Sequence, residues 1–217
     1  SGDVSLIASS GGIDDADGDS AVSGDDLAFS ATAGVGATNP IGTTVAEITS
    51  GSSTGIGDIN IIETNGIILT SLSNSDGHID IDAGGTVTAT SVATSGGTDT
   101  DDINITATGD GSNIEVGTIS AGGNGDVTLT ANDAGNQSVT DSTSAITADV
   151  LTITARDAIG AAGSPINTTA ASATLSTTAW TTSITYTAPV GLFSVLSTTS
   201  AGSAPQTSHV ASVSTIP

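Results

Sequence analysis

Asp58-Ile59-Asn60-Ile61 is the first of five short stretches in which branched aliphatic and polar residues alternate. Alternation with period two is typical of a β-strand that buries one face. Counted between the second residues of successive stretches, which are all aliphatic, the steps are 20, 24, 24 and 24 residues. This spacing predicts a chain of repeated turns, each contributing the same strand. The other four stretches are His78-Ile79-Asp80-Ile81, Asp102-Ile103-Asn104-Ile105, Asp126-Val127-Thr128-Leu129 and Val150-Leu151-Thr152-Ile153.

The aliphatic residues of these stretches are predicted to face one common interior. A single turn cannot cover its own apolar face, so successive turns must stack and place equivalent residues in columns. The interior should be narrow, because it is built from branched aliphatic residues and the chain is only 2% aromatic. The ten residues predicted to face inward are Ile59, Ile61, Ile79, Ile81, Ile103, Ile105, Val127, Leu129, Leu151 and Ile153.

Two further apolar segments follow the motif in the central repeats. Three strand segments in a turn of about 24 residues predict an all-β fold, a right-handed, three-sided parallel β-helix. The alternative is a tandem pair of β-sandwich modules, which usually need a bulkier aromatic core and have less regular strand spacing. The second segments are Ile67-Ile68-Leu69, Val87-Thr88-Ala89 and Ile114-Glu115-Val116, and the third contain Leu72, Val92 and Ile119.

A longer repeat of about 125 residues is superimposed on the turns. Leu27-Ala28-Phe29-Ser30-Ala31 matches Leu151-Thr152-Ile153-Thr154-Ala155, and Asn39-Pro40-Ile41 matches Ser164-Pro165-Ile166. The β-helix is therefore expected over residues 1–196, with one module at about 27–150 and a partial second copy at 151–196. Residues 197–217 lose the alternation and are expected to form a linker or a terminal strand that pairs with a neighbouring subunit.

The charge balance excludes several classes of function. The chain has 217 residues, 23 Asp and Glu, and a single cation, Arg156, which gives a formal net charge of -22. It cannot neutralise a row of phosphates, so nucleic-acid binding is excluded, and anionic membranes would repel it. No apolar run approaches the ~20 residues of a membrane-spanning helix, so membrane insertion is not expected. The absence of Cys excludes disulfides.

Some stretches resemble a known repeat family. Gly125-Asp126-Val127-Thr128-Leu129-Thr130-Ala131, and the run from Asp149 through Ala155 to Ile166, are similar to the repeats of filamentous-haemagglutinin-type adhesins and related giant bacterial exoproteins. The resemblance covers about residues 2–195. It implies a right-handed β-helix shaft, secretion, and a role at the cell surface or in the extracellular matrix. The expected function is a non-catalytic shaft or filament subunit of an adhesin or extracellular fibre. Its expected partners are further copies joined head to tail, neighbouring repeats of a longer chain, and cell-surface, matrix or glycan ligands.

Clusters of aspartates are the candidate metal ligands. Closely spaced carboxylates near a Gly turn suit Ca²⁺, which takes several oxygen ligands. The other interpretation is that they are solvated turn residues that keep the rod soluble and block edge pairing. Calcium would make the protein a calcium-dependent cell-surface or glycan-binding module, which is the main alternative function. The candidates are Asp14, Asp15, Asp17 and Asp19 in one cluster and Asp99, Asp101 and Asp102 in another, with Asp76, Asp80 and Asp82 as a third group.

Two other functions have less support in the sequence. A β-helix enzyme acting on acidic polysaccharide would need a cation to stabilise the substrate anion, and His78 and His209 have no Ser/Asp arrangement at a recognisable spacing. An ice-binding solenoid would need a broad threonine array, but the outward threonine pairs give way to Asn104 and then to acids in the preceding turns. The protein is therefore not expected to be an enzyme.

Overall fold

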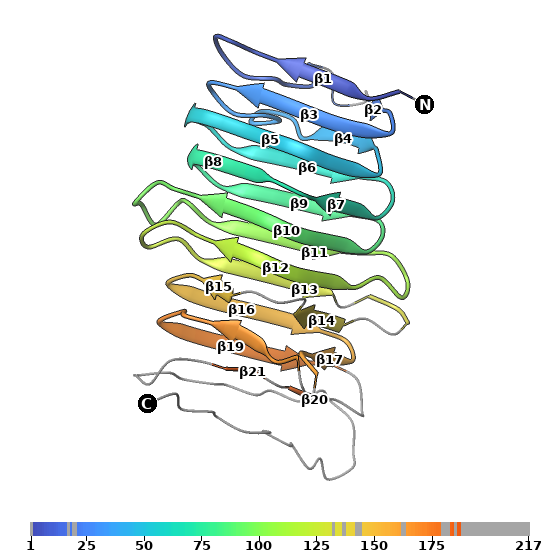
Figure 1. Ribbon diagram of the computed structural model, residues 1–217, viewed down its shortest axis with the longest axis vertical. Helices are drawn as coiled ribbons and strands as arrows, with labels where there is room; N and C mark the ends of the chain where they lie inside the picture. Colours follow the sequence, from blue (N-terminus) through green and yellow to red (C-terminus); the bar gives the residue numbers. More distant parts are fainter. Residues whose placement is uncertain are drawn as a thin grey trace.

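The computed structural model describes residues 2–16, 18, 21–131, 133–135, 138–141, 145–161, 164–178, 183–184 and 186–187. In this part of the chain, parallel strands stack as a β-solenoid of about 7 turns, with about 22 residues per turn and no helix (Figure 1). All strand pairs between named strands are parallel here, so the predicted parallel β-helix is confirmed and the β-sandwich alternative is excluded for these residues.

One side of the solenoid is a sheet of eight described strands built by the recurring motif. Ile103 lies in register with Ile79 in the turn before it and with Val127 in the turn after it. These residues are the vertical neighbours that the spacing predicted. In chain order the strands are β2 (Ala21–Ser23), β4 (Ile41–Thr44), β6 (Ile59–Glu63), β9 (Ile79–Ala83), β11 (Ile103–Ala107), β13 (Val127–Ala131), β16 (Val150–Ala155) and β19 (Ser172–Thr177).

The second sheet, of thirteen described strands, supplies two strand segments per turn. Strand β10 pairs with β7 at its start and with β8 at its end. Thr90 and Ser91 in its middle are both exposed, so the alternation breaks where the chain changes direction. Turns such as the one formed by β6, β7 and β8 therefore have three strand segments, as predicted. The strands are β1 (Val4–Ile7), β3 (Asp26–Ala31), β5 (Glu47–Ile56), β7 (Ile67–Leu69), β8 (Leu72–Asp76), β10 (Val87–Thr94), β12 (Ile114–Ser120), β14 (Ser138–Asp141), β15 (Ala145–Thr147), β17 (Ala158–Ile159), β18 (Ile166–Thr168), β20 (Ser183–Ile184) and β21 (Tyr186–Thr187).

The interior is one continuous apolar core that runs along the stack. All ten residues predicted to face inward are buried, with exposed fractions of at most 2%. Each is covered by the equivalent side chains of the turns on either side, which is the stacking that a single turn lacks. Full burial of one such side chain is worth about 1.5–3 kcal/mol.

Turn length varies more than the sequence spacing suggested. Ile59 lies in register with Ile79, whereas Val87 lies in register with Ile114, so the second of these turns is clearly longer than the first. Each of these two strand pairs keeps a constant register along its length, so the difference is taken up at the corners between strands. The extra residues on the longer turns include the segments 95–101 and 108–113, which lie outside the strands.

A phenylalanine ring fits into this narrow interior because the next turn has no side chain opposite it. Phe29 is 4% exposed and lies in register with Gly51 of β5, which in turn lies in register with Leu72 of β8. A Cβ atom at Gly51 would lie 2.6 Å from Leu72 Cδ1 and would clash with the Phe29 ring. Gly51 therefore provides the space for the ring, as close packing in a protein interior requires.

Some predictions fall outside the described residues. Residues 197–217, expected to form a linker or a terminal strand, lie outside them. So do Asp17 and Asp19 of the first aspartate cluster. The division into a module of about 125 residues and a partial second copy stays a prediction.

Candidate functional site

A column of aspartates lies just before the strands of the eight-stranded sheet. Asp58 Oδ1 accepts the backbone N–H of His78, in the next turn, at 3.1 Å. Asp102 Oδ1 accepts the N–H of Asp126 at 2.8 Å, and Asp126 Oδ1 accepts the N–H of Val150 at 3.0 Å. Hydrogen bonds to a charged acceptor are stronger than neutral ones. These carboxylates therefore strengthen the connection between successive turns.

The acids at this corner also repel one another. Burial raises the pKa of Asp126, the hydrogen bond from Val150 N–H lowers it, and the charges of Asp102, Asp149 and Asp99 raise it further. The net direction is upward. The folded protein thus holds several carboxylates close together at this corner, and their mutual repulsion costs free energy of folding. Two of them have an oxygen bonded to backbone N–H.

Asp101 is fully buried beside the same corner, with an exposed fraction of 0%. Its Oδ1 accepts the N–H of Gly77, in the preceding turn, at 2.9 Å. Its Oδ2 accepts Thr98 N–H at 2.7 Å and Thr98 Oγ1–H at 2.8 Å. Burial opposes ionisation of Asp101, but these three hydrogen bonds outweigh it and lower its pKa. Asp101 is therefore a charged structural acceptor that fixes its loop to the preceding turn.

The three acids predicted to bind calcium in this region do not converge. Asp99 is exposed, Asp101 is buried with both oxygens bonded, and Asp102 is bonded to Asp126 N–H. Within the described part of the chain, no group of three or more His, Asp or Glu side chains could hold a metal ion. Calcium needs six or more oxygen ligands around one point. Calcium binding at Asp99, Asp101 and Asp102 therefore stays a prediction, and the contacts that the structure shows for Asp101 and Asp102 are to backbone and Thr98 groups.

The first aspartate cluster is described only in part. Asp14 Oδ1 accepts the N–H of Asn39 at 3.0 Å and of Thr38 at 3.2 Å, both in the next turn. Hydrogen bonding from Asn39 N–H, together with that from Thr38, lowers the pKa of Asp14. Asp14 thus connects two turns in the same way as the other aspartates. Because Asp17 and Asp19 lie outside the described residues, calcium binding at this cluster stays a prediction.

A different group of acids lies on the outer face of the first turns. Asp26 of β3 is in register with Glu47 of β5. Burial raises the pKa of Asp26, and the charges of Asp3, Glu47 and Asp25 raise it further. A raised pKa in the folded state means that folding favours the neutral form. The charge of Asp26 therefore destabilises the fold at neutral pH.

We expect Asp26→Asn to raise the melting temperature at pH 7, because it removes this repulsion. The gain should be complete above the raised pKa and should disappear as the pH falls toward the usual value of 3.8, where wild-type Asp26 is itself protonated. Thermal melts followed by circular dichroism at pH 7 and pH 4 test this. Asp110→Asn, at an exposed acid further along the rod, makes the same charge change as a control. An Asp26→Asn gain no larger than that of the control would contradict the prediction.

His78 lies on the outer face between two turns. Its Nδ1 is 3.1 Å from Asp58 Oδ1, and its Nε2 is 3.1 Å from Asn60 Oδ1. Both ring nitrogens are therefore engaged by polar side chains of the preceding turn. His78 therefore connects neighbouring strands on the surface of the solenoid.

Glu63 is a buried acid that the sequence analysis did not single out. It is 1% exposed, and its Oε2 accepts Thr43 Oγ1–H at 2.8 Å and Val45 N–H at 3.1 Å. Its Oε1 accepts Asn65 N–H at 2.9 Å. Glu63 follows Ile61 by two positions, so its phase in the alternation would have shown that it points inward. It is a fully bonded structural carboxylate.

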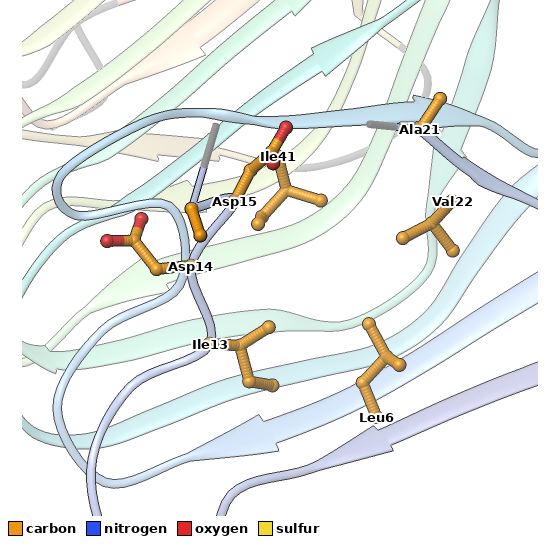
Figure 2. A pocket seen from close by; sticks show the side chains of 8 residues that line it. Leu6, Ile13, Asp14, Asp15, Ala21, Val22 and Ile41 are labelled. Carbon is orange, nitrogen blue, oxygen red and sulfur yellow. The ribbon is translucent and has the colours of Figure 1, made fainter. Parts of the chain in front are cut away.

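An apolar cavity of about 320 Å³ opens at the N-terminal end of the solenoid. The side chains of Leu6, Ile13, Val22 and Ile41 surround it, while the carboxylate of Asp14 points away (Figure 2). Asp15, which is 7% exposed, also lines the cavity. The cavity is thus the open end of the interior, with acids at its margin.

Among the described residues there is no helix long and apolar enough to cross a membrane. No protein-family model, no curated protein and no solved structure matches the chain.

Proposed function

We propose that this chain is a length of secreted, non-catalytic shaft in an adhesin or extracellular fibre of the filamentous-haemagglutinin style. The role is mechanical: the rod separates or connects the parts at its two ends. Secretion and the surface location rest on the resemblance of the repeats to those adhesins.

The observation that carries this proposal is the way each turn is fixed to the next. Backbone ladders run along both sheets, and the apolar core passes through the turns without interruption. Carboxylates add charged hydrogen bonds from one turn to another, and these carboxylates belong to Asp58, Asp101, Asp102 and Asp126. All these contacts act along the rod axis, the direction in which a shaft carries load.

The test is single-molecule stretching of the full chain held by handles at its two ends. Because each turn contacts its neighbours on the same sheets, we expect turns to detach one after another. Each event should lengthen the chain by ~75 Å, the extended length of about 22 residues. A chain that lengthens smoothly at low force, with no resisted steps, cannot serve as a shaft and would contradict the proposal.

The rival functions give different results in binding and activity assays. Binding of the chain to a glycan array or to cells in Ca²⁺, with release by EDTA, would support a calcium-dependent binding module. Depolymerisation of uronic-acid polysaccharides would support an enzyme. For a shaft, we expect neither activity from these turns and no change in melting temperature with EDTA.

A further inference from the structure

Asparagine is followed by glycine at two places in the chain, Asn65-Gly66 and Asn124-Gly125. In such a pair the backbone nitrogen of the glycine can attack the side-chain carbonyl carbon of the asparagine, because glycine has no Cβ atom to obstruct the approach. The attack needs an exposed asparagine side chain and a glycine N–H that no acceptor holds. Both asparagines are exposed, so the two sites differ at the glycine.

In the second pair the glycine is held in place. Gly125 is buried, and its N–H donates to Gly122 O at 2.8 Å, which closes a tight turn around Asn124. A Cβ atom at Gly125 would clash with Asp101 O, so the backbone of Gly125 is packed against the preceding turn. Attack by the Gly125 nitrogen would break this hydrogen bond and open the turn, which costs free energy.

In the first pair the glycine nitrogen is more accessible. Gly66 lies between β6 and β7 and is half-buried, and its N–H makes no hydrogen bond to another residue that the structure describes. Gly85 of the next turn lies against this nitrogen, so close that a Cβ atom at Gly85 would clash with it. Because Gly85 has no side chain, none covers the Gly66 nitrogen from that turn.

We propose that Asn65 is a site of spontaneous deamidation in the folded protein. The Gly66 nitrogen forms a bond to Asn65 Cγ and passes its proton to the side-chain NH₂ group, which leaves as ammonia. Water then opens the resulting five-membered succinimide at either of its two carbonyl carbons. One product is an ordinary aspartate at position 65, and the other is a β-linked aspartate whose main chain runs through the side-chain carbons. Each product adds one negative charge, and neither depends on the proposed shaft function.

Hydrogen bonds on either side of the pair should make the two products unequal in stability. Glu63 Oε1 accepts the N–H of Asn65 at 2.9 Å, and Thr86 O accepts the N–H of Ile67 at 2.9 Å. The β-linkage lengthens the main chain by one atom between these two bonds, so both cannot keep their geometry. We therefore expect the aged chain to melt at a lower temperature than fresh Asn65→Asp, which has the same charge and an unaltered main chain. Equal melting temperatures would overturn the β-linked product.

The first experiment follows the charge of the folded 217-residue chain by analytical anion exchange during incubation at pH 8. We expect a species with one extra negative charge, and Asn65→Ser should abolish it. Asn124→Ser is the matched control, because it makes the same change in the other Asn-Gly pair, and it should leave the rate unchanged. An acidic species that persists in Asn65→Ser would overturn the inference. So would a folded chain that forms none while the chain unfolded in urea does.

The second experiment separates the effect of the fold from that of the sequence. In urea the turn that holds Gly125 is open, so the Asn65→Ser variant should form the acidic species when unfolded and not when folded. Circular dichroism establishes that the variant is folded without urea. Equal rates in the two states would show that the hydrogen bond of Gly125 gives no protection, and would overturn the distinction on which the inference rests.

Discussion

Leu129→Asp is expected to unfold the central turns. Leu129 is 0% exposed and lies between Ile105 and Ile153 in the column. The substitution removes a buried aliphatic side chain and places an unpaired carboxylate in the core. Truncation of a buried leucine alone costs about 2–5 kcal/mol, and the unpaired polar group adds to it. We therefore expect a loss of about 4 kcal/mol or more, a large part of the stability of a typical domain.

The matched control is Thr130→Asp, at the next residue of the same strand. Thr130 faces outward and lies in register with Thr106 and Thr154, so the added charge meets solvent and no acid in those positions. Its effect on stability should be small. Urea unfolding followed by circular dichroism measures both variants. Equal stability of the two would mean that Leu129 does not face a closed interior.

Asp101→Asn is expected to destabilise the fold strongly through the loss of a single charge. The carboxylate accepts three hydrogen bonds, from Gly77 N–H, Thr98 N–H and Thr98 Oγ1–H. An asparagine must direct its NH₂ group toward one set of these donors, which leaves buried donors without an acceptor. Hydrogen bonds to charged groups are worth about 1.5–3 kcal/mol, so we expect a loss of about 2–3 kcal/mol.

The pH dependence gives an independent measurement at this site. The pKa of Asp101 is lowered in the folded state, so its contribution to stability is complete above the usual value of 3.8 and is lost as the pH falls through the lowered pKa. The difference between wild type and Asp101→Asn should therefore be constant near pH 7 and shrink in strong acid. Asp99→Asn, at the exposed neighbour, should show no comparable loss. A similar loss in both variants would mean that the hydrogen bonds of Asp101 contribute little.

The parallel solenoid could be predicted because its cause is local and repeated. Alternation within a short stretch identifies a strand with one buried face, and recurrence of that stretch at a constant spacing identifies its neighbour in the stack. The register of Ile79, Ile103 and Val127 follows directly from these two facts. The core was predictable for the same reason, since each inward aliphatic residue is covered by its own equivalent.

The role of the acids could not be predicted in this way. A carboxylate accepts a backbone N–H as readily as it binds a cation, and the composition of a cluster does not show which one it meets. Asp101 and Asp102 are adjacent in sequence, but one bonds to the preceding turn and the other to the following turn. Their partners lie about one turn away in opposite directions, so adjacency in the sequence did not show which backbone group each carboxylate meets.

The pairing of Phe29 with Gly51 could not be predicted from the sequence, for a related reason. A glycine within a strand normally suggests a bulge or a bend, and the partner of Gly51 is a residue one turn earlier in the chain. Only the register between turns shows that the glycine makes room for a ring. Size complementarity between turns depends on the offset of each pair, and these offsets differ from one turn to the next.

That variation gives the rod an evolutionary freedom. A chain whose corners absorb extra residues can acquire an insertion there without any change to its core or to the alignment of its strands. The segment 108–113 is a natural point for grafting new recognition loops onto an unchanged scaffold. Related proteins with this fold can therefore vary their exposed loops while the core and the register of the strands stay the same.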